Sequence, residues 1–170
     1  MLATQWLDVM FVPLLLMGIE RIDPVPGTSG GYGNVIIHAD YTHSLLGVAL
    51  IAALSGLVAA RVWSRRTGVV LGAVVFSHWL LDVVVHRGDM PILPAGMGGF
   101  PRVGFGLWRA PIASALVELA LVLAGSYLYF RAATESERAA GGATSRTVHL
   151  AAGLMLASGI VTLILNVLGY

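Results

Sequence analysis

The sequence contains no cysteine and no lysine among its 170 residues. Without cysteine the chain can form neither a disulfide nor a thiolate metal site, and it has no thiol nucleophile. Because lysine is absent, all ten basic residues are arginine, and the formal net charge is only +1. Nothing in this charge balance indicates a nucleic-acid-binding protein.

Charge of either sign is also scarce. Only 11% of the residues are charged and 57% are hydrophobic, whereas a soluble domain carries about 25% charged residues. This composition predicts an integral membrane protein, and the length predicts a single transmembrane helical domain over residues 1–170. The first apolar run lacks a basic n-region and a small-residue cleavage site, so we expect it to be retained as a helix.

A helix needs about 20 mostly apolar residues to cross a bilayer. The first candidate span is the weakest, because it contains Gln5, Asp8 and Pro13. We therefore expect an all-α bundle of about five transmembrane helices, at residues 4–19, 43–63, 67–86, 111–130 and 148–168. Four glycines within the second and third spans are typical of close helix packing: Gly47, Gly56, Gly68 and Gly72.

The connections between these spans are of two kinds. Two are short or polar, Arg61–Arg66 and Arg131–Arg146, and two are rich in glycine and proline, which disfavour regular helix. The polar connections hold six of the ten arginines, with a tight cluster in "RVWSRR". Because arginine favours the cytoplasmic side, we expect the N-terminus inside, the Gly/Pro loops outside and the C-terminus outside.

Most of the ionisable side chains lie near one membrane face, the face that bears the Gly/Pro loops. Four of the five histidines fall in "HADYTHS" and "SHWLLDVVVHRGD". Buried ionisable groups in a membrane are costly, and they normally face a cavity or a partner. The groups expected at this level are His38, His43, His78, Asp82, His86, Glu20, Asp23 and Glu118.

His78, Asp82 and His86 are spaced four residues apart, so a helix presents them on one face. His78 then lies about 12 Å deeper than His86. A histidine and a carboxylate one helical turn apart can bind a divalent cation together, as the histidine pair of zinc peptidases does. A catalytic zinc takes three protein ligands and leaves a position for water, and the same mixed ligands also suit manganese or iron.

These motifs resemble a known family. "HADYTHSLL" and "LGAVVFSHWLLD" are similar to the motifs of the YdjM-like, LexA-regulated family of membrane-bound metal-dependent hydrolases. The resemblance implies a metal-dependent hydrolase and names no substrate. It covers residues 20–94, and it assigns a family role to His38, Thr42, His43, Ser44, Ser77, His78 and Asp82.

The acidic motif after the first helix departs from the family pattern. The family carries a Pro-Asp-x-Asp motif, and this chain reads "GIERIDPVP". Asp23 matches the second aspartate, while Arg21 replaces the first and has Glu20 beside it. The resemblance to one subgroup also places His86, Asp89 and Trp108 in the pattern.

Together these observations predict a site near the outer membrane face. We expect His43, His78 and Asp82 to bind the metal, with His38, His86 or Asp23 completing the set, and Glu118 or Glu20 to transfer protons. Asp8 and His149 are interpreted as structural. The residues expected to contact substrate are Thr42, Ser44, Asp89, Trp108, Arg102 and Arg109. Ser44 can alternatively cap the start of the second span.

The predicted protein is therefore a membrane-embedded hydrolase of the inner or plasma membrane, acting on a lipid or lipid-linked ester or phosphoester. The cofactor is a divalent metal, with zinc expected first. Two other classes stay open at this stage. Histidines on neighbouring helices can ligate haem, and a polar cluster can serve a non-catalytic ion or proton path or an accessory subunit. Simple hydrogen-bonding between helices is the structural alternative.

Overall fold

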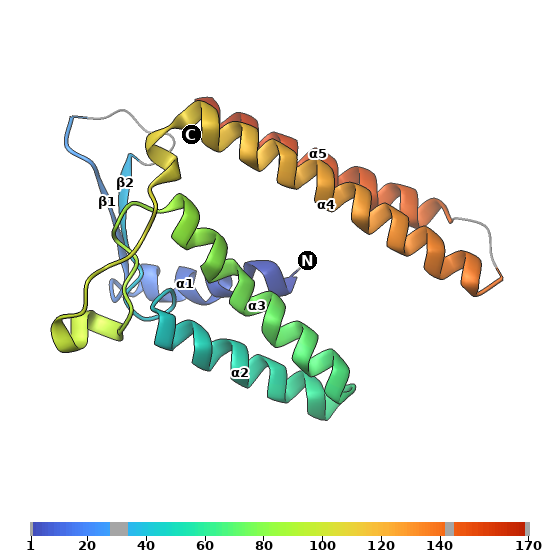
Figure 1. The fold of residues 1–170 in the computed structure, drawn as a ribbon, viewed down its shortest axis with the longest axis horizontal. Coiled ribbons are helices and arrows are strands. Elements are labelled where there is room, and N and C mark those ends of the chain that lie inside the picture. The colour runs from blue at the N-terminus through green and yellow to red at the C-terminus, as the bar shows by residue number, and fades with distance from the viewer. Residues whose placement is uncertain (1, 28–33, 142–144, 169–170) are drawn as a thin grey trace. The chain divides into compact units, whose positions relative to one another are not determined.

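A computed structural model describes residues 2–27, 34–141 and 145–168 (Figure 1). Within these residues, four helices are long and apolar enough to cross a membrane. They are α2 (Leu45–Val62), α3 (Arg65–Val85), α4 (Pro111–Ala139) and α5 (Arg146–Leu168). This confirms the all-α membrane class. The described residues up to Arg109 form one compact unit and those from Ala110 another, and each is described by itself.

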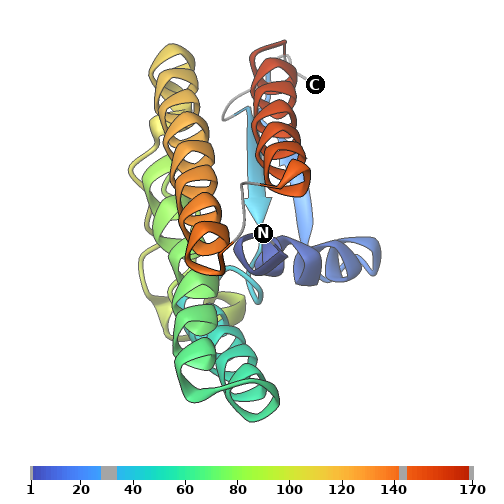
Figure 2. The same cartoon turned by 90° about the vertical axis from the view of Figure 1, so that its right-hand side faces the viewer.

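The first predicted span is shorter than expected. A 3-10 helix, η1 (Leu2–Gln5), leads into α1 (Trp6–Leu16), which has only 11 residues. The chain leaves the helix after Met17, and Gly18 adopts a positive φ of 71° that ends it. This helix is too short to cross a bilayer. Figure 2 shows α1 crossing α2 and α3 steeply instead of running beside them.

Helices α2 and α3 form a tight antiparallel hairpin. Ser44 and Ser64 are their N-caps, each accepting a hydrogen bond at 3.1 Å from the backbone N–H three residues later. Only Trp63 and Ser64 separate the two helices. Most of the predicted "RVWSRR" connection is therefore helical, because the serine cap allows α3 to begin at Arg65, two residues earlier than expected.

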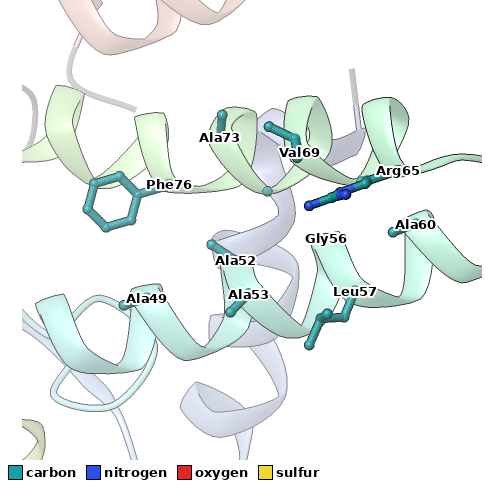
Figure 3. Close-up of a pocket in the computed structure, with 12 residues that line it drawn as sticks. Ala49, Ala52, Ala53, Gly56, Leu57, Ala60, Arg65, Val69, Ala73 and Phe76 are labelled. Carbon is teal, nitrogen blue, oxygen red and sulfur yellow. The ribbon is translucent and has the colours of Figure 1, made fainter.

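Small residues allow the α2 and α3 backbones to approach each other closely. A Cβ atom placed on Gly56 would lie 2.9 Å from the Gly68 carbonyl oxygen, and one on Gly68 would collide with the Gly56 carbonyl oxygen. A Cβ atom placed on Gly72 would lie 3.1 Å from the Ala52 carbonyl oxygen. This confirms the packing role predicted for these three glycines. Figure 3 shows the shallow apolar groove that remains along the pair, with Arg65 toward one end.

The buried core of the first unit lies where η1 and α1 meet this hairpin. Leu7, Val48 and Val75 are fully buried there, next to Ala52 and Trp79. By contrast, most large apolar side chains on the outer faces of α2 and α3 are exposed, as expected for helices that face lipid. The core thus fixes α1 against the ends of α2 and α3 that carry the histidines.

The Gly/Pro connection after α1 contains a short β-hairpin that the sequence did not predict. Strand β1 (Arg21–Pro24) pairs antiparallel with β2 (Val35–His38), in a register that places Arg21 opposite His38. The glycine-rich stretch 28–33, where we expected no regular helix, lies outside the described residues. The pairing brings the chain from the end of α1 back to the start of α2.

The second Gly/Pro connection folds back over the C-terminal end of α3. Met90 and Val103 form an isolated antiparallel bridge, and two short 3-10 helices follow the turns, η2 (Pro94–Gly99) and η3 (Leu107–Arg109). The Pro91 and Ile92 carbonyl groups accept hydrogen bonds from the Leu45 and Leu46 N–H groups. This loop therefore satisfies the otherwise free first N–H groups of α2.

In the second unit, α4 and α5 form a long hairpin (Figure 1). Helix α4 continues to Ala139, nine residues beyond the predicted end at Phe130. The extra residues, "RAATESERA", are good helix formers, and Arg131 pairs with Glu135 one turn later at 2.7 Å. The apolar run therefore marks the candidate membrane span. The helix continues beyond this run because the residues that follow also favour helix.

Candidate metal centre

Four ionisable side chains from three segments meet in the first unit. Asp8 comes from α1, His43 from the residues just before α2, and His78 and Asp82 from consecutive turns of α3. The ligand atoms of Asp8, His43 and His78 all lie within 4.8 Å of one another. Asp82 completes the cluster, because its Oδ2 atom lies 3.2 Å from Nε2 of His78 and 3.7 Å from Nε2 of His43.

Both imidazoles present the same nitrogen to the two carboxylates. Nε2 of His43 lies 3.5 Å from Asp8 Oδ1, and Nε2 of His78 lies 3.6 Å from Asp8 Oδ2. On the other side of the His78 ring, Nδ1 lies 2.6 Å from the Thr4 carbonyl oxygen. A carbonyl oxygen only accepts hydrogen bonds, so Nδ1 carries the hydrogen and Nε2 of neutral His78 is left with its lone pair.

His43 is buried and held on several sides. The Trp79 indole N–H donates a 2.9 Å hydrogen bond to its carbonyl oxygen, and the Phe11 ring packs edge-on against its imidazole at 5.7 Å. Its Nδ1 atom lies 2.8 Å from the Thr42 hydroxyl. These contacts fix the backbone and the ring, so Nε2 of His43 is aimed at the cluster before any ligand binds.

Asp82 has an orphan oxygen, which is a buried carboxylate oxygen without a hydrogen-bond donor. Its Oδ2 atom is buried and accepts no hydrogen bond of regular geometry from the described residues, although Nε2 of His78 lies 3.2 Å away, within ion-pair distance. Leaving a carboxylate oxygen buried without a donor costs free energy. A divalent cation is a suitable partner, because carboxylate oxygens and unprotonated imidazole nitrogens are its usual ligands. The donor set therefore fits a divalent metal.

Two of the predicted ligands form a pair of their own on the β-hairpin. Nε2 of His38 lies 3.0 Å from Asp23 Oδ2, and Arg21 pairs with the same oxygen at 3.2 Å. The hairpin register explains this pairing, since His38 lies opposite Arg21, two residues from Asp23. The structure thus brings His38 and Asp23 to each other and not into the four-residue cluster.

His86 and Asp89 form another pair at the end of α3. Nδ1 of His86 lies 3.2 Å from Asp89 Oδ1, and the Trp108 ring packs against the imidazole at a centroid distance of 4.5 Å, tilted by 40°. The helix ends at Val85, and His86 adopts an extended backbone with ψ of 148°. The expected stripe of three residues therefore stops after Asp82, because His86 has left the helix.

The remaining predicted residues have defined places as well. Ser44 caps α2 and its hydroxyl donates to the Tyr41 carbonyl oxygen at 3.1 Å. Arg102 donates to Asp40 and to the Asp89 carbonyl oxygen, both at 2.8 Å. Arg109 is exposed, and Glu118 belongs to α4 in the second unit. Glu20 and Thr42 are buried and bonded to each other next to His43.

Asp8 is the site residue that the sequence analysis missed. It was interpreted as structural because a first helix parallel to the others would place residue 8 away from the histidine level. The short α1 instead crosses the hairpin, and this orientation delivers the carboxylate to His43 and His78. The available signal was the carboxylate itself, since an acidic residue inside an apolar run indicates a functional partner.

A comparison with known proteins identifies the family of this chain. No curated protein and no solved structure matches the sequence. The profile of one family, described as YdjM inner membrane protein, matches residues 7–168. The match extends beyond the motifs around residues 20–94 and includes Asp8, His43, His78 and Asp82. The chain belongs to the YdjM inner membrane protein family.

Proposed function

We propose that this protein is a membrane-embedded metal-dependent hydrolase that acts on a lipid or lipid-linked ester or phosphoester. The observation that carries the proposal is the convergence of two imidazole Nε2 atoms and two carboxylates, one of them with a buried orphan oxygen. A purely structural ion pair between helices needs one histidine and one carboxylate, and it does not need both rings fixed with Nε2 toward the acids.

Each residue of the four-residue cluster has a proposed role. His43, His78 and Asp8 hold the cation, for which zinc is proposed first and manganese or iron fit the same donors. A bound ion of this kind supplies a water whose pKa is lowered to about 7. Asp82 lies against both histidines, so its Oδ2 atom serves either as a fourth ligand or as the acceptor of the water proton.

The position of the site along the helices supports a lipid-linked substrate. His43 precedes the first turn of α2, and Asp82 lies one turn before the end of α3. This position supports a site close to one membrane face, near the level of the lipid head groups. Arg109 is exposed in the adjoining loop and is proposed to contact an anionic head group.

We further propose that this face is the outer one. Arg61, Arg65 and Arg66 gather at the opposite end of the α2–α3 hairpin, and arginine near a span favours the cytoplasmic side. With four crossing helices in place of five, the N-terminal helix α1 lies on the outer side together with the C-terminus. The cytoplasmic N-terminus expected from the sequence depended on α1 crossing the membrane.

This orientation is testable because the chain has no native cysteine. A single cysteine at exposed Pro101, in the loop proposed outside, is expected to react with a membrane-impermeant maleimide in intact spheroplasts. A cysteine at exposed Trp63, in the α2–α3 turn, is expected to react only after permeabilisation. Labelling in the reverse pattern would place the site at the cytoplasmic face.

The activity itself is tested on the purified protein in detergent. We expect about one zinc per chain by elemental analysis, and chelator-sensitive hydrolysis of bis-p-nitrophenyl phosphate, p-nitrophenyl butyrate or a fluorescent phospholipid. His78→Ala is expected to lower both bound zinc and the hydrolysis rate at least about 100-fold, because it removes a ligand. The matched control is His149→Ala, since His149 belongs to α5 of the second unit, where its ring contacts the Ser145 carbonyl oxygen and the Phe130 ring.

Three outcomes would contradict the proposal. Full metal content and activity in His78→Ala would remove the site from the chemistry. A strong Soret band in the purified protein would favour the haem-binding alternative. Ion flux in reconstituted vesicles, with no hydrolysis of any of the three substrates, would favour an ion- or proton-handling role.

A further inference from the structure

Glu20 is a buried carboxylate whose role the four-residue cluster does not explain. Its relative exposure is 1%, although it lies directly before β1 at the end of the α1 segment. Burying a carboxylate is costly unless it is well hydrogen-bonded. Glu20 meets this requirement through the "HADYTHS" stretch: its Oε1 atom accepts the Tyr41 and Thr42 backbone N–H groups, both at 2.8 Å.

The Thr42 hydroxyl connects Glu20 to the metal centre. Its oxygen lies 2.8 Å from Glu20 Oε2 and 2.8 Å from Nδ1 of His43. An ionised carboxylate only accepts hydrogen bonds, so the hydroxyl donates its single hydrogen to Glu20. The hydroxyl oxygen must then accept from His43, which places the imidazole hydrogen on Nδ1. In the neutral ring, Nε2 is then left with its lone pair, on the side of Asp8 and Asp82.

We propose that Glu20 and Thr42 are positioning residues that hold His43 in its Nδ1–H tautomer, ready to bind a cation through Nε2. This inference rests on the proposed function for its consequence, metal affinity, but not for the tautomer itself. Outer hydrogen bonds of this kind orient metal-binding imidazoles, and their loss costs about 10- to 100-fold in affinity. The Thr4 carbonyl group has the same effect on His78.

Glu20→Gln is the sharpest test. It reverses the hydrogen bonds that run from Glu20 through Thr42 to His43, and it keeps the shape of the side chain. The Gln amide oxygen must stay at the Oε1 position, where two backbone N–H groups point at it. The amide NH₂ group then occupies the Oε2 position and donates to the Thr42 hydroxyl oxygen. The hydroxyl thereby loses its shorter acceptor, at Oε2, and its hydrogen is expected to turn toward Nδ1 of His43, which favours the Nε2–H tautomer and blocks the ligand atom.

The tautomer is read directly from long-range ¹H–¹⁵N spectra of ¹⁵N-histidine-labelled protein in detergent, without metal and at a pH high enough for the imidazole to be neutral. The wild type is expected to show His43 as the Nδ1–H form, and Glu20→Gln to shift it toward Nε2–H. In Thr42→Val no hydroxyl remains, so neither tautomer of His43 is enforced. Both variants are expected to bind zinc about 10- to 100-fold more weakly in competition with a chelator.

Thr42→Ser is the conservative rescue. It keeps the hydroxyl, so the wild-type tautomer and a zinc affinity within about twofold are expected, while a merely space-filling role of Thr42 would make Ser and Val behave alike. The inference is overturned if Glu20→Gln and Thr42→Val both keep the wild-type tautomer. If the wild type shows the Nδ1–H form but binds no zinc, the proposed function is contradicted. The inference that Glu20 and Thr42 fix the tautomer of His43 would still hold.

Discussion

Asp8→Asn is expected to lower zinc affinity at least about 100-fold, and Asp23→Asn is expected to leave it within about twofold. Asp8 presents its two oxygens to Nε2 of His43 and Nε2 of His78, at 3.5 Å and 3.6 Å. Asp23 contacts His38 and Arg21 instead. Losing a ligand costs more than losing an outer hydrogen bond, which alone costs about 10- to 100-fold.

The two variants form a matched pair. Both replace a carboxylate by an amide of the same shape, and both aspartates are about half exposed, with side-chain exposures of 46% and 48%. The affinity is measured by competition with a fluorescent zinc chelator, with helical circular dichroism as the check on folding. A large loss in Asp23→Asn with none in Asp8→Asn would restore the ligand set predicted from the family motif and contradict the geometry.

The membrane fold follows closely from the sequence, because long apolar runs are its main determinant. The predicted spans at 43–63, 67–86, 111–130 and 148–168 correspond to α2–α5. The ends depend on local chemistry that hydropathy does not report. Ser64 starts α3 early, and the helix-forming residues after Phe130 extend α4. The β-hairpin depends on long-range pairing across a glycine-rich connection, which local patterns do not encode.

The centre of the site was predictable for an equally simple reason. His78 and Asp82 are one helical turn apart, and this spacing alone places them together. His43 lies just before α2, and a two-residue turn joins α2 to α3, so His43 lies at the same end of this hairpin as Asp82. Asp8 could not be placed in this way, because its position depends on how a short helix crosses the hairpin.

The outer members of the predicted ligand set depended on assumptions about the backbone. His86 was placed on the helical stripe, and the helix ends one residue before it, so its imidazole pairs with Asp89 and Trp108. His38 was placed at a loop start, and strand pairing aligns it with Arg21 and Asp23. A helix end and a strand register are both set by tertiary contacts. Spacing along the sequence therefore predicted the positions of His78 and Asp82 correctly, but not those of His86 and His38.

The largest effect on stability is expected from Gly68→Leu. Gly68 is buried against α2, where any Cβ atom would collide with the Gly56 carbonyl oxygen and lie 2.9 Å from the Ala60 Cα atom. These are backbone atoms of a helix, so they cannot turn aside as a side chain does. We expect α2 and α3 to be forced apart, at a cost of about 3 kcal/mol or more in the free energy of unfolding.

Gly153→Leu is the control, since it makes the same change at a helical glycine of α5. A Cβ atom at Gly153 meets nothing within 4 Å in the part of the chain that the structure describes. Leucine also favours helix over glycine by up to about 1 kcal/mol. Unfolding in detergent, followed by circular dichroism, is therefore expected to show a lower midpoint for Gly68→Leu and an unchanged or higher midpoint for Gly153→Leu.

The same pair of variants connects packing to the metal centre. His43 directly precedes α2 and His78 lies on α3, the two helices whose close approach Gly68 permits, and their ring centroids are 5.6 Å apart. If the separation extends along the hairpin as far as the site, the two Nε2 atoms move apart, and zinc affinity is expected to fall together with stability in Gly68→Leu. Wild-type zinc affinity in a clearly destabilised Gly68→Leu would show that the cation is held without the close approach of α2 and α3.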